Sequence, residues 1–161
     1  MNTAVAKNLA KIGLLVALIV IATGATANAQ SLQYPLKANI PFDFNVGNKK
    51  LPAGKYSFQR AQPSSGDLIV QISSIQGHTT VNQTTMPKLT FTPNNKGVLI
   101  FHRYGDEYFL AQVWPASSET GRELVKSRAE RDVQRKTHDY VGMAATKAPQ
   151  VETITIVADL Q

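Results

Sequence analysis

The chain has no cysteine among its 161 residues, and this absence excludes several classes of site at once. Without thiols there is no disulfide scaffold, no cysteine-ligated zinc or iron–sulfur site, no thiol nucleophile and no cysteine to carry a lipid anchor. Glycine-rich phosphate loops and the G-x-S-x-G pattern of serine hydrolases are missing as well. The sequence therefore predicts no catalytic and no cofactor-binding residue, and we expect the protein not to be an enzyme.

Metal-ligand spacing is missing too. The three histidines, His78, His102 and His138, fall in different predicted elements and show neither the H-x-H nor the H-E-x-x-H pattern. We interpret His102 as a packed or half-exposed histidine of a β face, and His138 as a group that complements the dipole at a helix C-terminus. The sequence predicts no metal-ligating residue.

The longest apolar run lies near the N-terminus. Residues 12–22 are eleven consecutive apolar residues preceded by two lysines, whereas a membrane-spanning helix needs about 20. Small residues follow, and an A-x-A sequence ends at Ala29. We expect residues 1–29 to be a signal peptide that is cleaved between Ala29 and Gln30. Cleavage two residues earlier and an uncleaved N-terminal anchor are the alternatives.

Removal of the signal peptide changes the charge of the protein. The whole chain has a net charge of +6, but Lys7 and Lys11 leave with the signal, so the 132 residues that remain carry +4. A chain of this length can bury one hydrophobic core without disulfides. We expect a single β-rich domain over residues 30–161. It is expected to be exported to the periplasm or the extracellular space, with no stable membrane anchor after cleavage.

Residues 37–114 have the pattern of an antiparallel β fold. This zone is rich in β-branched and aromatic residues, and turn signals interrupt it every eight to twelve residues. We expect a mainly β fold, a single antiparallel β-sandwich or partly open barrel of about seven to eight strands, with one charged C-terminal α-helix before a final strand. Apart from one hairpin, the expected strands are 37–46, 55–60, 67–74, 78–85, 88–92 and 151–158.

The strongest hairpin signal surrounds Gly105-Asp106. Residues 98–104 and 107–114 are rich in apolar side chains, and a two-residue loop with glycine first is typical of a type II′ turn. Because both faces carry apolar residues, we expect the hairpin to be central in its sheet and covered on both sides. The register that this turn predicts pairs Phe101 with Leu110, Ile100 with Ala111 and His102 with Phe109.

Residues 116–138 are charged and almost free of β-branched residues, which indicates a helix. Thr120-x-x-Glu123 fits a capping box, so we expect the helix to run over 120–138, on the surface or projecting from it. Six Lys or Arg side chains of 119–138 interleave with four acids, which favours a salt-bridged helix over a nucleic-acid surface. The expected ion pairs are Glu123/Lys126, Lys126/Glu130, Arg128/Asp132 and Asp132/Lys136.

Three stretches of the chain carry a resemblance to a group of known proteins. They are IPFDF (40–44) with LPAGKY (51–56), FHRYGDEYFL (101–110), and GREL (121–124) followed by Lys126-Ser127. Together they resemble a set of small exported proteins from acidobacteria-type soil bacteria that have no assigned function, over most of the mature chain. The resemblance implies export and a β-rich fold, and it implies no catalytic residue.

Carboxylates offer one enzymatic alternative. Asp43 lies on the polar face of the first predicted strand, and Asp106 with Glu107 lies at the hairpin tip. A glycosidase-type acid and base pair needs two facing carboxyl groups, whereas turn chemistry accounts for Asp106 more simply. The sequence Asn82-Gln83-Thr84 matches a glycosylation sequon, which we interpret as a chance match in a bacterial exported chain.

The sequence therefore favours a binding protein. We expect an exported, non-enzymatic β-domain that binds an unknown protein or envelope component and no nucleic acid. One alternative is a carrier of a lipid or another small hydrophobic ligand, in which aromatic side chains line a cavity instead of filling a core. The other is an enzyme, which would show a polar cleft with His102 and a carboxylate within hydrogen-bond reach. The aromatic side chains concerned are Phe42, Phe44, Tyr56, Phe58 and Phe101.

Overall fold

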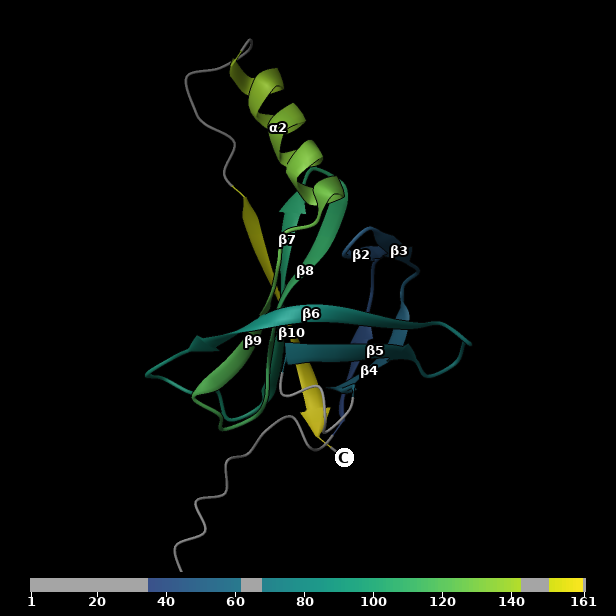
Figure 1. Cartoon of the computed structure of the whole chain (residues 1–161), viewed down its shortest axis with the longest axis vertical. Coiled ribbons are helices and arrows are strands. Elements are labelled where there is room, and N and C mark those ends of the chain that lie inside the picture. The colour runs from purple at the N-terminus through teal and green to yellow at the C-terminus, as the bar shows by residue number, and fades with distance from the viewer. Residues whose placement is uncertain (1–34, 62–67, 143–150, 161) are drawn as a thin grey trace, which may run out of the picture. The chain divides into compact units, whose positions relative to one another are not determined.

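The computed structural model describes residues 35–61, 68–142 and 151–160, and it leaves the side chains at 138–142 and 159–160 outside the description (Figure 1). The predicted signal peptide, the side chain of His138 and most of the small-residue segment before Pro149 fall outside the described residues. Within the described ranges the chain is mainly β, with one helix before a final strand, which confirms the predicted fold class.

Ten strands and one helix make up the described part of the chain. Hydrogen bonds join the strands in the order β3-β2-β8-β7-β10-β1-β4-β5-β6-β9, and β8 also pairs with β9. All neighbours are antiparallel except β2 and β8. The elements are β1 (Leu36–Ile40), β2 (Phe44–Val46), β3 (Lys49–Leu51), β4 (Gly54–Arg60), β5 (Ile69–Ser74), β6 (Thr80–Leu89), β7 (Gly97–Tyr104), β8 (Glu107–Trp114), β9 (Thr120–Leu124), α2 (Arg128–Gly142) and β10 (Glu152–Leu160).

Two long strands each belong to two parts of the sheet. Strand β10 pairs with β7 over 152–158 and with β1 at its last two residues. Strand β6 pairs with β5 over 80–84 and with β9 over 85–89. Strands that change partners in this way turn a sheet so that its parts face each other across a core. The pairing of β8 with β9 then brings the sheet back on itself.

The interior is filled by aliphatic and aromatic side chains. Phe44, Tyr56, Phe58 and Phe101 are each at most 1% exposed. The ring of Phe44 meets Tyr56 edge to face with 5.0 Å between centroids, and Phe101 at 5.6 Å. Edge-to-face packing of this kind adds about 0.5–1.5 kcal/mol per pair to the burial of apolar area. The inward residues of β1, β4, β5 and β7 surround these rings.

The β7–β8 hairpin has the predicted turn and the predicted register from the turn back to Phe101. Gly105 has a φ of +61° and Asp106 a negative φ, as a type II′ turn requires. Phe101 pairs with Leu110 and His102 with Phe109, as expected. The predicted pairing of Ile100 with Ala111 is wrong, because a β-bulge inserts one residue into β8 and places Gln112 opposite Ile100. A bulge re-aims the chain locally and often adjoins a site.

The predicted strand 37–46 is two strands, β1 and β2, separated at Pro41–Asp43. Pro41 has no N–H to donate, so the ladder with β4 ends at Ile40. The chain then enters a different part of the sheet, where β2 pairs with β3 and β8. The predicted apolar face holds, since Ile40, Phe44 and Val46 are buried.

The two strands predicted at 78–85 and 88–92 form one strand, β6, that continues through Pro87. Its first half has β5 as partner and its second half has β9. Among the described strands, residues 85–89 therefore have a neighbour on one edge only. Proline is tolerated in a strand at such an edge because the missing N–H costs no hydrogen bond.

The helix predicted over 120–138 is wrong in its first part. Residues Thr120–Leu124 form β9, and α2 begins at Arg128. Residues 120–124 form a strand and not a helix because β6 and β8 both pair with them. In addition, Gly121 lies against the ring of Trp114, where a Cβ would overlap the ring. The working cap is Ser127-x-x-Glu130, in which the Glu130 N–H donates to Ser127 Oγ at 3.1 Å.

The start of α2 is tied to the sheet. The Ala129 N–H donates to Asn48 Oδ1 of the β2–β3 turn at 3.3 Å, so two of the exposed N–H groups of the first turn have side-chain acceptors. The side chain of Glu130 does not reach back to its own cap but points to β7. Among the described residues, no helix has the length and apolar character that crossing a membrane requires.

Candidate functional site

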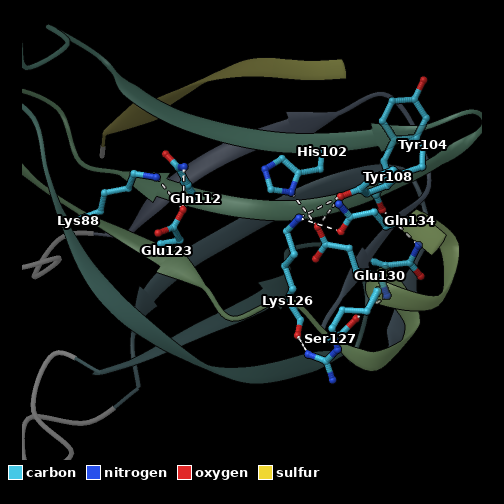
Figure 2. A network of polar contacts seen from close by, with 12 residues as sticks. Lys88, His102, Tyr104, Tyr108, Gln112, Glu123, Lys126, Ser127, Glu130 and Gln134 are labelled. Carbon is cyan, nitrogen blue, oxygen red and sulfur yellow. Dashed lines mark hydrogen bonds and ion pairs between the residues drawn. The ribbon is translucent and has the colours of Figure 1, made fainter. Parts of the chain in front are cut away.

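A buried carboxylate joins helix α2 to strand β7 (Figure 2). The Glu130 side chain is 6% exposed, and its Oε1 lies 2.7 Å from His102 Nδ1. The Tyr104 hydroxyl donates to the same oxygen at 3.2 Å. A buried carboxylate needs such partners because its desolvation is costly. Glu130 thus fixes both the first turn of α2 and the orientation of the His102 ring.

Lys126 completes this network from the segment between β9 and α2. Its Nζ donates to Gln134 Oε1 at 3.1 Å and lies 3.5 Å from the Tyr104 hydroxyl. The guanidinium of Arg131 donates to the Lys126 carbonyl at 2.6 Å. The predicted pairing of Lys126 with Glu130 is therefore replaced by contacts to neutral oxygens. The network links the first two turns of the helix to strand β7, which lies inside the sheet between β8 and β10.

The burial of Tyr104 raises the pKa of its hydroxyl above the ordinary value of 10.0. Desolvation is the largest cause, and the charge of Glu130 and its hydrogen bond to the hydroxyl add to it in that order. All three causes disfavour the charged phenolate form of Tyr104. Tyr104 is thus held as a hydrogen-bond donor.

A second polar cluster lies on the same face, between β6, β8 and β9 (Figure 2). Glu123 accepts from Lys88 Nζ at 2.7 Å and from Gln112 Nε2 at 3.2 Å. Gln112 in turn accepts from Trp114 Nε1 at 2.9 Å. The predicted ion pair of Glu123 with Lys126 is replaced by the pair with Lys88, because Glu123 stands on a strand and not on the helix.

A small cleft of about 240 Å³ lies between the two clusters. The bulged residue Ala111 and the apolar side chains beside it form part of the wall, and His102 and Glu130 form another part. The bond to Glu130 uses Nδ1 of His102, so it leaves Nε2 as the second polar atom of the ring. The full lining is Met86, His102, Ala111, Glu123, Leu124, Val125, Lys126 and Glu130.

The cleft satisfies the geometric criterion for the enzymatic alternative, because His102 has a carboxylate within hydrogen-bond reach. A carboxylate on Nδ1 orients an imidazole so that Nε2 faces outward. The described residues that line the cleft nevertheless include no serine, threonine or cysteine to act as a nucleophile beside it. The arrangement can hold a polar group or a water molecule and can orient the helix.

The other predicted candidates are not brought together. Asp43 accepts from the Ala53 N–H at 3.0 Å and lies 3.6 Å from Lys50 Nζ, so it stabilises the turn after β3. Asp106 and Glu107 are exposed at the hairpin tip. Of the described residues, no group of three or more His, Asp or Glu side chains is placed to hold a metal ion. His78 is exposed in the segment before β6.

The aromatic side chains considered for a carrier pack against one another. Phe44, Tyr56, Phe58 and Phe101 belong to the core. Phe42 is half-buried at its margin, where it stacks on Tyr108 with 4.0 Å between ring centroids. The rings thus fill the interior with contacts to each other.

Apolar side chains are exposed at the end of β6. Phe91 is 100% exposed, Leu89 is 75% exposed and Met86 is 59% exposed. We call these three residues the β6 apolar end. Met86 and Leu89 lie three positions apart on a strand, so they point to opposite faces of the sheet. The sequence signal for this surface is the short predicted strand 88–92, which places Leu89 and Phe91 on one side but does not indicate what covers them.

Charges on α2 are distributed differently from the prediction. Arg128 lies 3.9 Å from Asp132, which confirms that pair, and Arg135 also pairs with Asp132. Glu119 and Glu123 lie outside the helix, and Glu130 is buried. The exposed helix surface is therefore more basic than the interleaved sequence suggests.

Comparison with known proteins adds no relative. No family model, no curated protein and no solved structure matches the chain.

Proposed function

We propose that the mature chain is an exported, non-enzymatic β-domain that binds a protein partner of the bacterial envelope or the extracellular space. Export rests on the predicted signal peptide with cleavage near Ala29 and Gln30. Binding is assigned to the β6 apolar end. The observation that carries the proposal is the full exposure of Phe91 beside Leu89, on a chain whose other phenylalanines are buried or half-buried.

The exposure of Phe91 and Leu89 favours a partner. A soluble domain exposes many single apolar residues, but two large ones that lie two positions apart at the end of a strand are typical of an interaction surface. Aromatic side chains that enter a pocket of a partner often supply most of its binding energy. At the β6 apolar end the strand also has a free edge among the described residues, so a partner can approach from the side and over both faces.

The packed interior supports this function over the carrier. A carrier needs an internal cavity of several hundred Å³ for a lipid-sized ligand. The aromatic rings that would line such a cavity are in mutual contact instead. The cleft beside His102 is about 240 Å³, and charged or polar side chains make up half of its lining.

The proposal is tested by crosslinking in the cells that produce the protein. A tagged full-length chain is expressed, crosslinked and fractionated, in parallel with the double variant Leu89→Ser/Phe91→Ser. The control is Ile75→Ser, which replaces an apolar residue that is 48% exposed in the β5–β6 connection. We expect the wild type and the control to give one crosslinked species in the exported fraction, and the double variant to reduce it about tenfold.

Two results would contradict the proposal. Recovery of only free monomer in every fraction would remove the partner. Equal crosslinking of the wild type and the double variant would remove the β6 apolar end as its site. Mass measurement of the recovered chain adds a check on export, because a processed chain begins at Gln30.

A further inference from the structure

Helix α2 carries more exposed positive charge than its sequence balance indicates. Among its described side chains, Arg128, Arg131, Arg135 and Lys136 are exposed. Two acids are among the described side chains of the helix, but Glu130 is 4% exposed and bonded to His102 and Tyr104. Four cations therefore face solvent with one half-exposed acid, Asp132.

That remaining acid is surrounded by the cations. Asp132 pairs with Arg135 and lies 3.9 Å from Arg128. The hydrogen bond from Arg135 is the main cause that lowers the pKa of Asp132, and the charges of Arg135, Arg128 and Lys136 lower it further. Among the described side chains of α2, the exposed carboxylate therefore lies next to cations on both sides along the helix.

The cations form a row. Arg128, Arg131 and Arg135 are separated by three and four positions, which places them on one face of a helix over about 10 Å. Arg128 and Arg135 are 86% and 75% exposed in their side chains. We call these two, with Arg131 and Lys136, the α2 basic face.

Most of the α2 basic face lies apart from the side of the helix that is tied to the sheet. Ala129, Glu130 and Gln134 make hydrogen bonds to the strands and their connections, and of the basic face only Arg131 has such a bond among the described residues. Arg131 donates with one nitrogen to the Lys126 carbonyl and stays exposed. The basic face is therefore open to a partner of opposite charge.

We propose that the α2 basic face docks on the anionic headgroups of a membrane surface. A straight row of arginines presented by one helix fits a flat surface of dispersed negative charge, and each Lys or Arg near such a surface strengthens binding about fivefold. The choice of a membrane rests on the proposed export, because a protein that is carried across a membrane is released next to a lipid surface. The association is peripheral and leaves the chain without an anchor.

Vesicle sedimentation tests this docking with the processed protein isolated from the exported fraction. Vesicles with about one third phosphatidylglycerol are compared with vesicles of phosphatidylcholine alone, at low salt and at about 1 M salt, where charges are screened beyond about 3 Å. We expect at least about tenfold more protein bound to the anionic vesicles at low salt, and loss of that difference at high salt. Equal binding to the two vesicle types would overturn the proposal.

Charge variants assign the binding to the helix. The triple variant Arg128→Gln/Arg131→Gln/Arg135→Gln should weaken binding to anionic vesicles about a hundredfold. Asp132→Asn should strengthen it, because it removes the one acid among the cations. The control Lys49→Gln/Lys50→Gln changes two exposed lysines of β3 and should change binding severalfold at most. A triple variant that binds as well as the wild type would overturn the assignment.

Additional binding measurements with DNA and an acidic polysaccharide distinguish docking on a membrane from binding to another polyanion. Circular dichroism of each variant checks that the fold is retained. If DNA or an acidic polysaccharide binds in the same arginine-dependent way and the anionic vesicles do not, the membrane is the wrong occupant. The Leu89→Ser/Phe91→Ser variant should bind vesicles like the wild type. Loss of crosslinks with retained vesicle binding, or the reverse, therefore distinguishes failure of one surface from failure of the other.

Discussion

Phe101 and Phe91 are the same side chain in opposite settings. Phe101 is 0% exposed and meets Phe44 in the interior, whereas Phe91 is 100% exposed just after β6. Removing the ring of Phe101 would remove its contacts with the core side chains around it. Removing the ring of Phe91 would remove few contacts within this chain, because that ring is exposed. The difference indicates that the first set holds the fold together and that the second set is free to bind something else.

The largest effect is expected in the interior. Phe101→Ala removes a buried ring and leaves a cavity, so we expect the free energy of unfolding to fall by about 3–5 kcal/mol. Chemical denaturation measures this change through the midpoint. A loss below about 1 kcal/mol would mean that the interior is looser than its contacts indicate, and the comparison with Phe91 would fail.

Loss of the buried carboxylate of Glu130 in α2 should cause the second-largest fall in the free energy of unfolding. Glu130→Ala leaves His102 and Tyr104 without their shared acceptor, and we expect a loss of about 2–3 kcal/mol. Hydrogen exchange should speed up in the first turns of α2 and remain slow in the strands around Phe101. The matched control is Asp132→Ala, a solvent-facing acid of the same helix, which should leave the denaturation midpoint nearly unchanged. Similar losses in both variants would show that burial of Glu130 stabilises little.

The pH dependence of stability above pH 10 gives a second test of the buried network around Glu130 and Tyr104. The raised pKa of Tyr104 means that the folded protein keeps the phenol proton at a pH where the unfolded chain releases it. Stability from this group is present below the ordinary tyrosine pKa of about 10 and is lost as the pH rises through the folded value. Tyr104→Phe should therefore flatten the fall in stability above pH 10.

Tyr56 provides a parallel case inside the core. Its pKa is also raised, first by desolvation and then by the charge of Asp43. Tyr56→Phe should remove its own share of the alkaline slope and the hydrogen bond to the Pro52 carbonyl at 2.8 Å. Identical slopes in wild type and both variants would contradict the assignment.

The smallest effect on stability is expected at the exposed end. Phe91→Ser should change the free energy of unfolding by no more than about 0.5 kcal/mol, because the ring has little to lose on replacement. Thermal unfolding checks this value. A loss comparable with that of Glu130→Ala would mean that Phe91 supports the fold, and its exposure would no longer favour a partner.

Local patterns predicted much of the fold. Alternation and the Gly105-Asp106 turn were enough for the β7–β8 hairpin, since both strands and their turn are adjacent in sequence. They could not predict the bulge at Ala111, which lies between the residues of β8 that pair with β2 and with β9, two strands distant in sequence. The start of the helix failed for a similar reason. Thr120-x-x-Glu123 and Ser127-x-x-Glu130 both fit a capping box, and pairing with β6 and β8 decides between them.

Sequence reasoning named His102 as the centre of a possible cleft but could not identify Glu130 as its carboxylate partner. His102 and Glu130 are 28 positions apart, and nothing local indicates that a helical glutamate will turn away from its cap toward a strand. The exposure of Phe91 was also not predicted, because the sequence did not indicate that β6 ends at Leu89. The Leu89 and Phe91 pattern was visible, but an apolar pair on a strand is usually buried.

Site-specific photocrosslinking tests whether Phe91 contacts a partner. A photoreactive phenylalanine analogue replaces Phe91 in one chain and Ile75 in another, and both are irradiated in the producing cells. We predict a discrete larger adduct from position 91 in the exported fraction and none from position 75. The same adduct from both positions, or none from position 91 in a folded and exported chain, would contradict it.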